Sequence, residues 1–254
     1  MQPQKSFYVT DWLNKRAKLT PDKLALSDVA SGAEITYSQW NANANQTANF
    51  LLELGVRRGD RVAVYATNSV AYLDIWMACG KIGAILQNVN WRLTVSEIKQ
   101  LVADAAPTLL IYSAEFVEQV NGLRPIVSSV QHFVAIDETL ATPSDVAFTG
   151  RDACADLLLT TPELHPDDPW VICYTGGSTG LPKGAILTHA NMAWNSINTV
   201  MSWGLAPNDV TVLNSPLFHT GGLNVFTLPL IHIGGCNGLS PFSMRSSHGL
   251  PRAP

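Results

Sequence analysis

Charged residues are scarce in this sequence, and long apolar runs are absent. Asp, Glu, Lys and Arg make up 14% of the 254 residues, whereas apolar residues make up 46%, a balance typical of a globular chain and not of a disordered one. The formal net charge of −4 argues against a basic surface for nucleic acid or for an anionic membrane. No segment reaches the roughly 18 consecutive apolar residues that a membrane span needs. The amino-terminal residues also lack the apolar core of a secretory signal.

Cysteine pairs are missing as well. The four cysteines lie far apart and form no Cys-x-x-Cys motif: Cys79, Cys154, Cys173 and Cys236. This pattern argues against a disulfide framework and predicts reduced thiols in a cytoplasmic protein. Nothing in the sequence indicates an oligomeric state.

Strand-like and helix-like apolar patterns alternate along most of the chain. Helix-period segments, several with capping residues or a closing glycine, occur at 11–19, 38–54, 69–83, 94–106, 114–121 and 189–203. Short apolar runs that predict strands occur at 24–29, 34–36, 61–66, 84–86, 108–112, 132–136 and 210–213. Strands separated by helices predict an α/β fold with layered, mostly parallel sheets flanked by helices on both faces.

Residues 174–184 carry the clearest chemistry. They read Tyr-Thr-Gly-Gly-Ser-Thr-Gly-Leu-Pro-Lys-Gly and lie between two apolar runs, 171–174 and 185–187, that predict short buried strands. Glycines allow backbone N–H groups to turn toward an anion, and the hydroxyl and ammonium groups add further donors. The spacing matches neither the Walker pattern nor the dinucleotide-binding pattern. It predicts a phosphate-binding loop, here called the phosphate loop, with an ordinary turn as the alternative.

A second motif follows downstream: Pro216-Leu-Phe-His-Thr-Gly-Gly222. Together the two motifs resemble the signatures of adenylate-forming enzymes, the AMP-binding family of acyl- and aryl-CoA synthetases, luciferases and peptide-synthetase adenylation domains. Residues 55–63 and 83–94 also resemble the amino-terminal region of that family. The resemblance covers an incomplete domain at residues 11–235. Residues 236–254 show neither strand nor helix period, and we expect there a disordered tail that is foreign to the fold.

The resemblance implies a two-step reaction on a carboxylic acid. ATP converts the acid into an acyl-adenylate with release of pyrophosphate, and coenzyme A then accepts the acyl group. The residues implied to bind the β- and γ-phosphates are Thr175, Gly176, Gly177, Ser178, Thr179, Gly180 and Lys183, with Mg²⁺ near Thr175. Because no protein nucleophile takes part, no catalytic residue is assigned. Gly176 stands where the family often has a serine.

The resemblance also implies a substrate-binding role for the second motif. His219 is similar to the family's aromatic residue at the junction of the carboxylate and nucleotide sites, and Thr220 and Gly221 would begin the acyl pocket. A histidine packed at a helix start, with its hydrogen bonds to the backbone, is the alternative interpretation. The motif favours a fatty acid or another hydrophobic carboxylate as the substrate, with aryl carboxylates second.

Several segments of the family are missing from this sequence. It has no Tyr-Gly-x-Thr-Glu-like motif, no Thr-Gly-Asp segment for the ribose and no small carboxyl-terminal domain. We therefore expect a truncated portion of an AMP-forming acid–thiol ligase, which performs neither half-reaction by itself. The alternative function is that of a catalytically inactive nucleotide-binding fragment.

Overall fold

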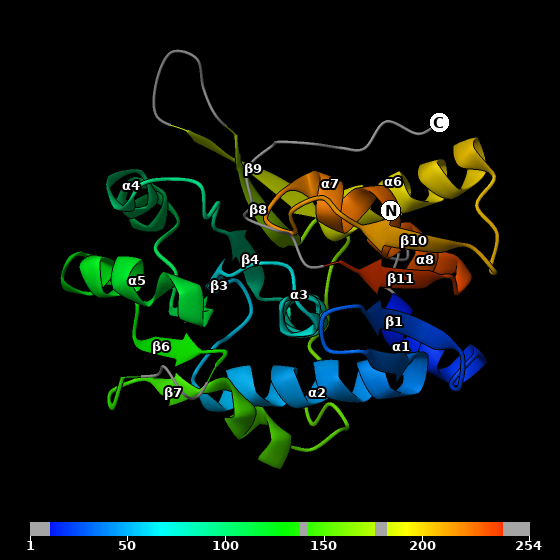
Figure 1. The fold of residues 1–254 in the computed structure, drawn as a ribbon, viewed down its shortest axis with the longest axis horizontal. Helices are drawn as coiled ribbons and strands as arrows, with labels where there is room; N and C mark the ends of the chain where they lie inside the picture. Colours follow the sequence, from blue (N-terminus) through cyan, green and yellow to red (C-terminus); the bar gives the residue numbers. More distant parts are fainter. Residues whose placement is uncertain (1–10, 138–141, 176–181, 241–254) are drawn as a thin grey trace, which may run out of the picture.

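Two β-sheets with helices packed against them make up the fold (Figure 1). The computed structural model describes residues 11–137, 142–175 and 182–240. Within these ranges, the strands of the larger sheet are β3 (Arg61–Tyr65), β4 (Ile85–Asn88), β5 (Leu109–Tyr112), β6 (His132–Ala135), β7 (Val146–Ala147), β8 (Pro169–Thr175) and β9 (Lys183–Thr188). The strands of the smaller sheet are β1 (Leu24–Asp28), β2 (Ala33–Thr36), β10 (Val210–Leu213) and β11 (Cys236–Leu239). The predicted α/β class with layered sheets is confirmed.

Polar caps explain where several of the helices begin and end. The α-helices in the described ranges are α1 (Trp12–Leu19), α2 (Tyr37–Glu53), α3 (Val70–Ile82), α4 (Val95–Ala105), α5 (Val117–Leu123), α6 (His189–Trp203), α7 (Thr220–Gly222) and α8 (Leu228–Ile233). Ser69 caps α3, and Gly83 ends it with a positive φ of 72°. Thr94 and Glu97 form a capping box at the start of α4. None of the described helices combines the length and the hydropathy that a membrane crossing requires.

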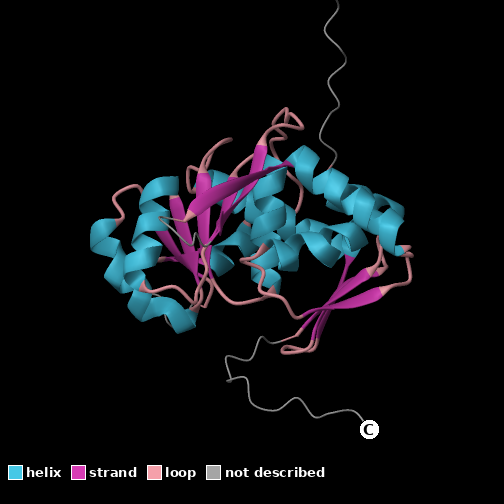
Figure 2. Cartoon of the chain, turned by 90° about the horizontal axis from the view of Figure 1, so that it is seen from above, coloured by secondary structure: helices cyan, strands magenta, loops and turns pink. Residues whose placement is uncertain are grey.

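The larger sheet has the strand order β7-β6-β5-β3-β4-β8-β9, and helices cover both of its faces (Figure 2). All its pairs are parallel except β8 with β9, which is antiparallel. Successive side chains of a strand point to opposite faces. Val62 and Val64 of β3 accordingly pack into the core formed with α2 and α3, whereas Ala63 and Tyr65 pack into the core formed with α4 and α5. The prediction of a mostly parallel sheet covered on both faces is confirmed.

The irregular tail predicted from residue 236 onward does not begin there, because residues 236–239 form a strand of the smaller sheet. β11 lies in the middle of this sheet, paired in parallel with both β1 and β10. The prediction that residues 236–239 lack a strand is therefore wrong, whereas residues 241–254 lie outside the described residues. The sequence Cys-Asn-Gly-Leu hides the strand because Asn and Gly have low strand propensity. Pairing on both sides overrides that propensity, and Asn237 and Leu239 are buried.

The strand after the phosphate loop is also less buried than predicted. β9 is the edge strand of the larger sheet, and its residues from Lys183 to Ile186 are exposed. Of the apolar run 185–187, only Leu187 packs against the core. An apolar run in the sequence cannot distinguish an edge strand from a central one, since that difference depends on which strands pair with it.

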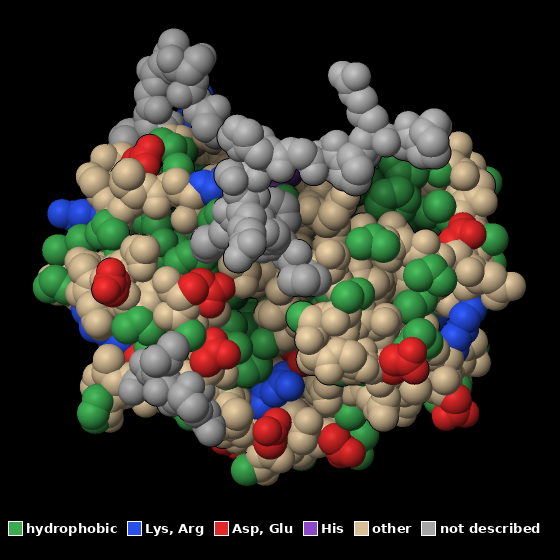
Figure 3. All heavy atoms as spheres, in the orientation of Figure 1, with side chains coloured by type: hydrophobic (Ala, Val, Ile, Leu, Met, Phe, Trp, Pro, Cys, Tyr) green, Lys and Arg blue, Asp and Glu red, His purple; other side chains and the backbone are tan. Residues whose placement is uncertain are grey.

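Apolar side chains remain on the surface around the smaller sheet. Val210 and Val212 on the edge strand β10 are exposed, and so are Trp194 and Met201 on α6. Figure 3 shows apolar patches and charged side chains of both signs scattered over the face that is turned to the viewer in Figure 1.

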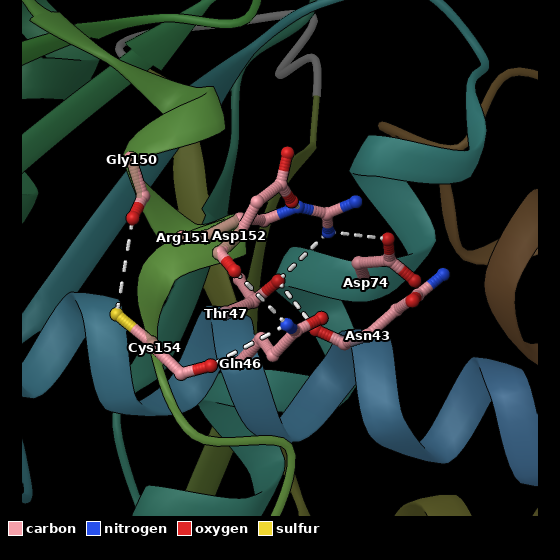
Figure 4. Close-up of polar contacts among 8 residues, drawn as sticks. All are labelled: Asn43, Gln46, Thr47, Asp74, Gly150, Arg151, Asp152 and Cys154. Carbon is pink, nitrogen blue, oxygen red and sulfur yellow. Dashed lines mark hydrogen bonds and ion pairs between the residues drawn. The ribbon is translucent and has the colours of Figure 1, made fainter.

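A buried ion pair fastens the segment after β7 to the two long helices α2 and α3 (Figure 4). Arg151, in the 3₁₀ segment Phe148–Ala153, donates to Asp74 Oδ2 of α3 at 2.6 Å and to Thr47 Oγ1 of α2 at 2.9 Å. The Asp74 side chain is fully buried. Burial raises the pKa of Asp74 to about 6, while the Arg151 charge opposes that rise. The charge of Asp74 at neutral pH therefore depends on Arg151.

His189 joins the start of α6 to the aromatic core. Its ring is buried and stacks on the Trp170 indole, with ring centroids 4.9 Å apart, and Trp170 stacks on Trp76 with centroids 5.3 Å apart. Burial lowers the pKa of His189 to about 4, although the nearby Asp168 charge opposes the shift. The ring is therefore neutral at pH 7. Its place at the helix start and in the aromatic stack indicates a structural role.

The depressed pKa of His189 predicts a loss of stability in acid. An unfolded histidine binds a proton below about pH 6.5, whereas His189 in the folded chain binds one only below about pH 4, so the free energy of unfolding falls as pH falls through this window. His189→Phe keeps the stacked ring and removes the titration. Relative to the parent, we expect this variant to gain about 2 kcal/mol between pH 7.5 and pH 5 in urea denaturation. Parallel pH profiles for the two proteins would show that His189 is not buried as described.

Candidate functional site

The carboxyl ends of β3, β4 and β8 meet at one edge of the larger sheet. β4 pairs in parallel with β3 on one side and with β8 on the other, so the segments that follow these three strands emerge next to one another. In open α/β sheets, ligands bind outside the carboxyl ends of the strands. The phosphate loop follows β8 and therefore begins at the edge where a ligand site is expected.

The structure describes both ends of the phosphate loop. Thr175 ends β8 and Lys183 begins β9, and both side chains are exposed. The two residues face each other across the strands, and Thr175 Oγ1 donates to the Lys183 carbonyl oxygen at 3.4 Å. The other predicted residues of the loop lie outside the described residues: Gly176, Gly177, Ser178, Thr179 and Gly180. An exposed hydroxyl and an exposed ammonium group thus frame the loop.

Two side chains at the same edge hold the second motif. Asn68, in the segment after β3, donates to the Ser215 carbonyl oxygen at 2.9 Å and accepts from the Leu217 N–H at 2.8 Å. Trp91, in the segment after β4, makes an edge-to-face contact with Phe218, with ring centroids 5.7 Å apart. The residues that lead into His219 are therefore fixed to the strand ends next to β8.

His219 lies at the start of the short helix α7. Its exposed ring accepts a hydrogen bond at Nδ1 from the Gly221 N–H at 3.2 Å. Gly222 allows this tight turn, because a Cβ there would lie 2.5 Å from the Pro216 carbonyl oxygen. This hydrogen bond to the backbone is the contact expected if His219 is a structural residue at a helix start. Substrate binding by His219, Thr220 and Gly221 stays a prediction.

The sequence reasoning missed three residues at this edge: Asn68, Trp91 and Arg92. The Arg92 guanidinium lies 5.0 Å from the Trp91 ring centroid and 5.8 Å from that of Phe218, which places a positive charge beside the second motif. Trp91 and Arg92 lie within residues 83–94, and the resemblance of that segment to the family was the sequence signal that could have pointed to them. No sequence signal pointed to Asn68, because its partners lie 147 and 149 residues away.

The side chains gathered here are of kinds that can bind and position ligands. Lys183 and Arg92 can attract anions, and the Thr175 hydroxyl can donate to a phosphate oxygen. The rings of Trp91 and Phe218 offer an apolar surface close to the second motif. Such a set of groups suits the transfer of a group between bound substrates, in which positioning and charge stabilisation supply the catalysis.

The comparison with protein families agrees with this geometry. A family model described as AMP-binding enzyme matches residues 13–251, which include both motifs and the segments that hold them. The chain belongs to this family.

Two curated relatives and one solved structure show how far the likeness extends. Feruloyl-CoA synthase of an Amycolatopsis species is 34% identical over 214 residues, 84% of this chain and 40% of that protein. Indoleacetate–CoA ligase of Aromatoleum aromaticum is 33% identical over 218 residues, 85% of this chain and 42% of that protein. The anthranilate CoA ligase AuaEII, solved with anthranoyl-AMP, superposes with a TM-score of 0.88 at 25% identity over 94% of this chain and 46% of its own. The chain therefore spans less than half the length of these AMP-binding relatives.

The contacts of Asn68 predict its effect on stability. Asn68→Ala removes three hydrogen bonds, and it leaves the Ser215 carbonyl just before the second motif and the Leu217 N–H within it without this partner. We expect the free energy of unfolding to fall by about 1–3 kcal/mol in urea denaturation. Asn208→Ala is the control, because Asn208 is exposed beside β10 and should change stability by less than about 0.5 kcal/mol. Equal stabilities of the two variants would contradict the role given to Asn68.

Proposed function

We propose that this chain supplies the ATP-binding and carboxylate-binding portions of an AMP-forming acid–thiol ligase. The complete reaction would activate a carboxylic acid with ATP as an acyl-adenylate and then transfer the acyl group to coenzyme A. The observation that carries this proposal is the meeting of the two family motifs at one edge of the sheet. The relatives are CoA ligases or synthases by name, which supports the same class of reaction.

In this proposal the phosphate loop holds the β- and γ-phosphates of ATP. The Lys183 ammonium group and the Thr175 hydroxyl are donors that suit phosphate oxygens, and the exposure of both leaves room for the nucleotide. Mg²⁺ takes few ligands from the protein and the rest from phosphates and water, which the single hydroxyl of Thr175 fits. The metal would neutralise part of the phosphate charge. His219, followed by Thr220 and Gly221, would lie where the carboxylate meets the nucleotide.

For the carboxylic acid we propose a hydrophobic compound. The second motif favours a fatty acyl group, whereas the feruloyl, indoleacetyl and anthranoyl groups named for the relatives are aromatic. The rings of Trp91 and Phe218 form an apolar surface that suits either class. Comparing octanoate with ferulate as substrates of a chain that also contains the downstream family motifs would separate the fatty acid from the aromatic acid.

A chain that binds nucleotide without turnover is the alternative function. The relatives extend well beyond the matched region, and the expected ribose-binding and Mg²⁺-carboxylate motifs do not occur in this sequence. We expect the 254-residue chain to show no carboxylate-dependent exchange of pyrophosphate into ATP. Measurable exchange would favour an active ligase over the alternative.

The four free cysteines agree with the proposed cytoplasmic location.

The role of Lys183 can be tested by ATP binding alone. Lys183→Ala removes the ammonium group at the end of the phosphate loop, and we expect the Kd for Mg-ATP to rise about ten-fold or more in isothermal titration calorimetry. Lys99→Ala is a matched control, since Lys99 is an exposed lysine on α4 and carries the same charge. Equal losses of affinity in both variants would show a non-specific effect of charge and contradict the proposed contact.

A further inference from the structure

The hairpin that carries the phosphate loop extends beyond the sheet. The pairing of β4 with β8 ends at Asn88 and Cys173, whereas the pairing of β8 with β9 continues for two further pairs. These pairs join Tyr174 to Gly184 and Thr175 to Lys183. An isolated two-stranded ribbon is only marginally stable in water. The position of the loop ends therefore needs a further contact with the body of the protein.

Tyr174 makes such a contact. Its hydroxyl donates a hydrogen bond of 2.5 Å to Asp104 Oδ2, in the last turn of α4. The Tyr174 ring lies against its cross-strand partner, because a Cβ on Gly184 would come within 3.3 Å of the ring. The side chain thus touches β9 with its ring and α4 with its hydroxyl. Tyr174 directly precedes Thr175, the first residue proposed to meet the phosphates.

The position of Asp104 supports a specific role for this bond. A carboxylate near the carboxyl end of a helix is disfavoured by the partial negative charge of the helix terminus. The last turn of α4 therefore offers Asp104 no local stabilisation. A hydrogen bond from a phenol to a charged carboxylate is stronger than one between neutral groups. Burial and the nearby Asp104 charge raise the pKa of Tyr174, so the phenol keeps the proton that it donates.

We propose that the hydrogen bond between Tyr174 and Asp104 holds the β8–β9 hairpin against α4 and so positions Thr175 and Lys183 for ATP. Tyr174 and Asp104 are positioning residues in this view, because they act through Thr175 and Lys183. The proposal rests on the proposed binding of ATP. A hairpin held in place before ATP arrives loses less conformational freedom on binding, which raises affinity.

Tyr174→Phe tests the proposal, because it removes the hydroxyl and keeps the ring over Gly184. We expect the Kd for Mg-ATP of the 254-residue chain to rise about three- to ten-fold. The matched control is Tyr112→Phe, which removes a hydrogen bond of the same kind, from Tyr112 to Asp145, on β5. This control should leave the Kd unchanged even where it lowers stability. Asp104→Ala should match Tyr174→Phe, and the double variant should lose no more affinity than either single variant.

Hydrogen–deuterium exchange supplies a second readout that needs no ATP. In Tyr174→Phe, amides of β9 should exchange at least about five-fold faster than in the parent, whereas amides of β5 should not change. Faster exchange together with weaker ATP binding supports the proposal. Unchanged exchange overturns it, and an altered Kd would then mean that the hydroxyl touches the nucleotide. Faster exchange with an unchanged Kd would show that the bond holds the hairpin but does not affect ATP binding, and this result also overturns the proposal.

The same measurements separate failure of this proposal from failure of the proposed function. A parent chain that binds no Mg-ATP would contradict ATP binding by this chain and, with it, the positioning of ATP by Tyr174. Exchange would then still show whether the bond holds the hairpin. A parent that binds Mg-ATP with the same Kd as Tyr174→Phe would leave the proposed function intact and overturn only the role of Tyr174.

Discussion

The parallel pairing of β4 with β8 is the interaction on which the candidate site depends. It connects the strand that carries the phosphate loop to the centre of the larger sheet, at Leu86 with Val171 and onward to Asn88 with Cys173. Because β3 also pairs in parallel with β4, the segments after all three strands emerge at the same edge. Asn68 and Trp91 in two of these segments then hold the second motif. Backbone pairing thus brings together two motifs that are distant in the sequence.

Buried polar contacts reinforce that pairing at the end nearest the loop. The Tyr72 hydroxyl of α3 donates to Asn88 Oδ1 at 2.7 Å, and Asn88 Nδ2 donates to the Cys173 sulfur at 3.3 Å. Further from the site, the buried Lys81 ammonium group of α3 donates to Asp11 and Asn41. A buried polar group without a partner is unfavourable, so each contact disfavours other arrangements of the same helices and strands. The edge that carries the site is therefore held both by backbone pairing and by side chains.

Much of the fold could be predicted from the sequence because its signals are local. The Ser69 cap, the capping box of Thr94 and the closing Gly83 depend on residues a few positions apart, and they mark α3 and α4 correctly. β11 was missed because its pairing partners, not its own residues, make it a strand. The exposure of β9 depends on its place at the sheet edge. In the site, the motifs indicated the family, but the role of Asn68 depends on contacts that exist only in the folded chain.

The central claim is that the hairpin formed by β8 and β9 presents a loop that binds the terminal phosphates of ATP. Phosphorus-31 NMR of Mg-ATP titrated with the 254-residue chain tests it most directly, because each phosphate gives its own signal. The account predicts that the β- and γ-phosphate signals shift or broaden more than the α-phosphate signal, and that excess pyrophosphate reverses the change. Three signals that stay unchanged at saturating protein would contradict the account.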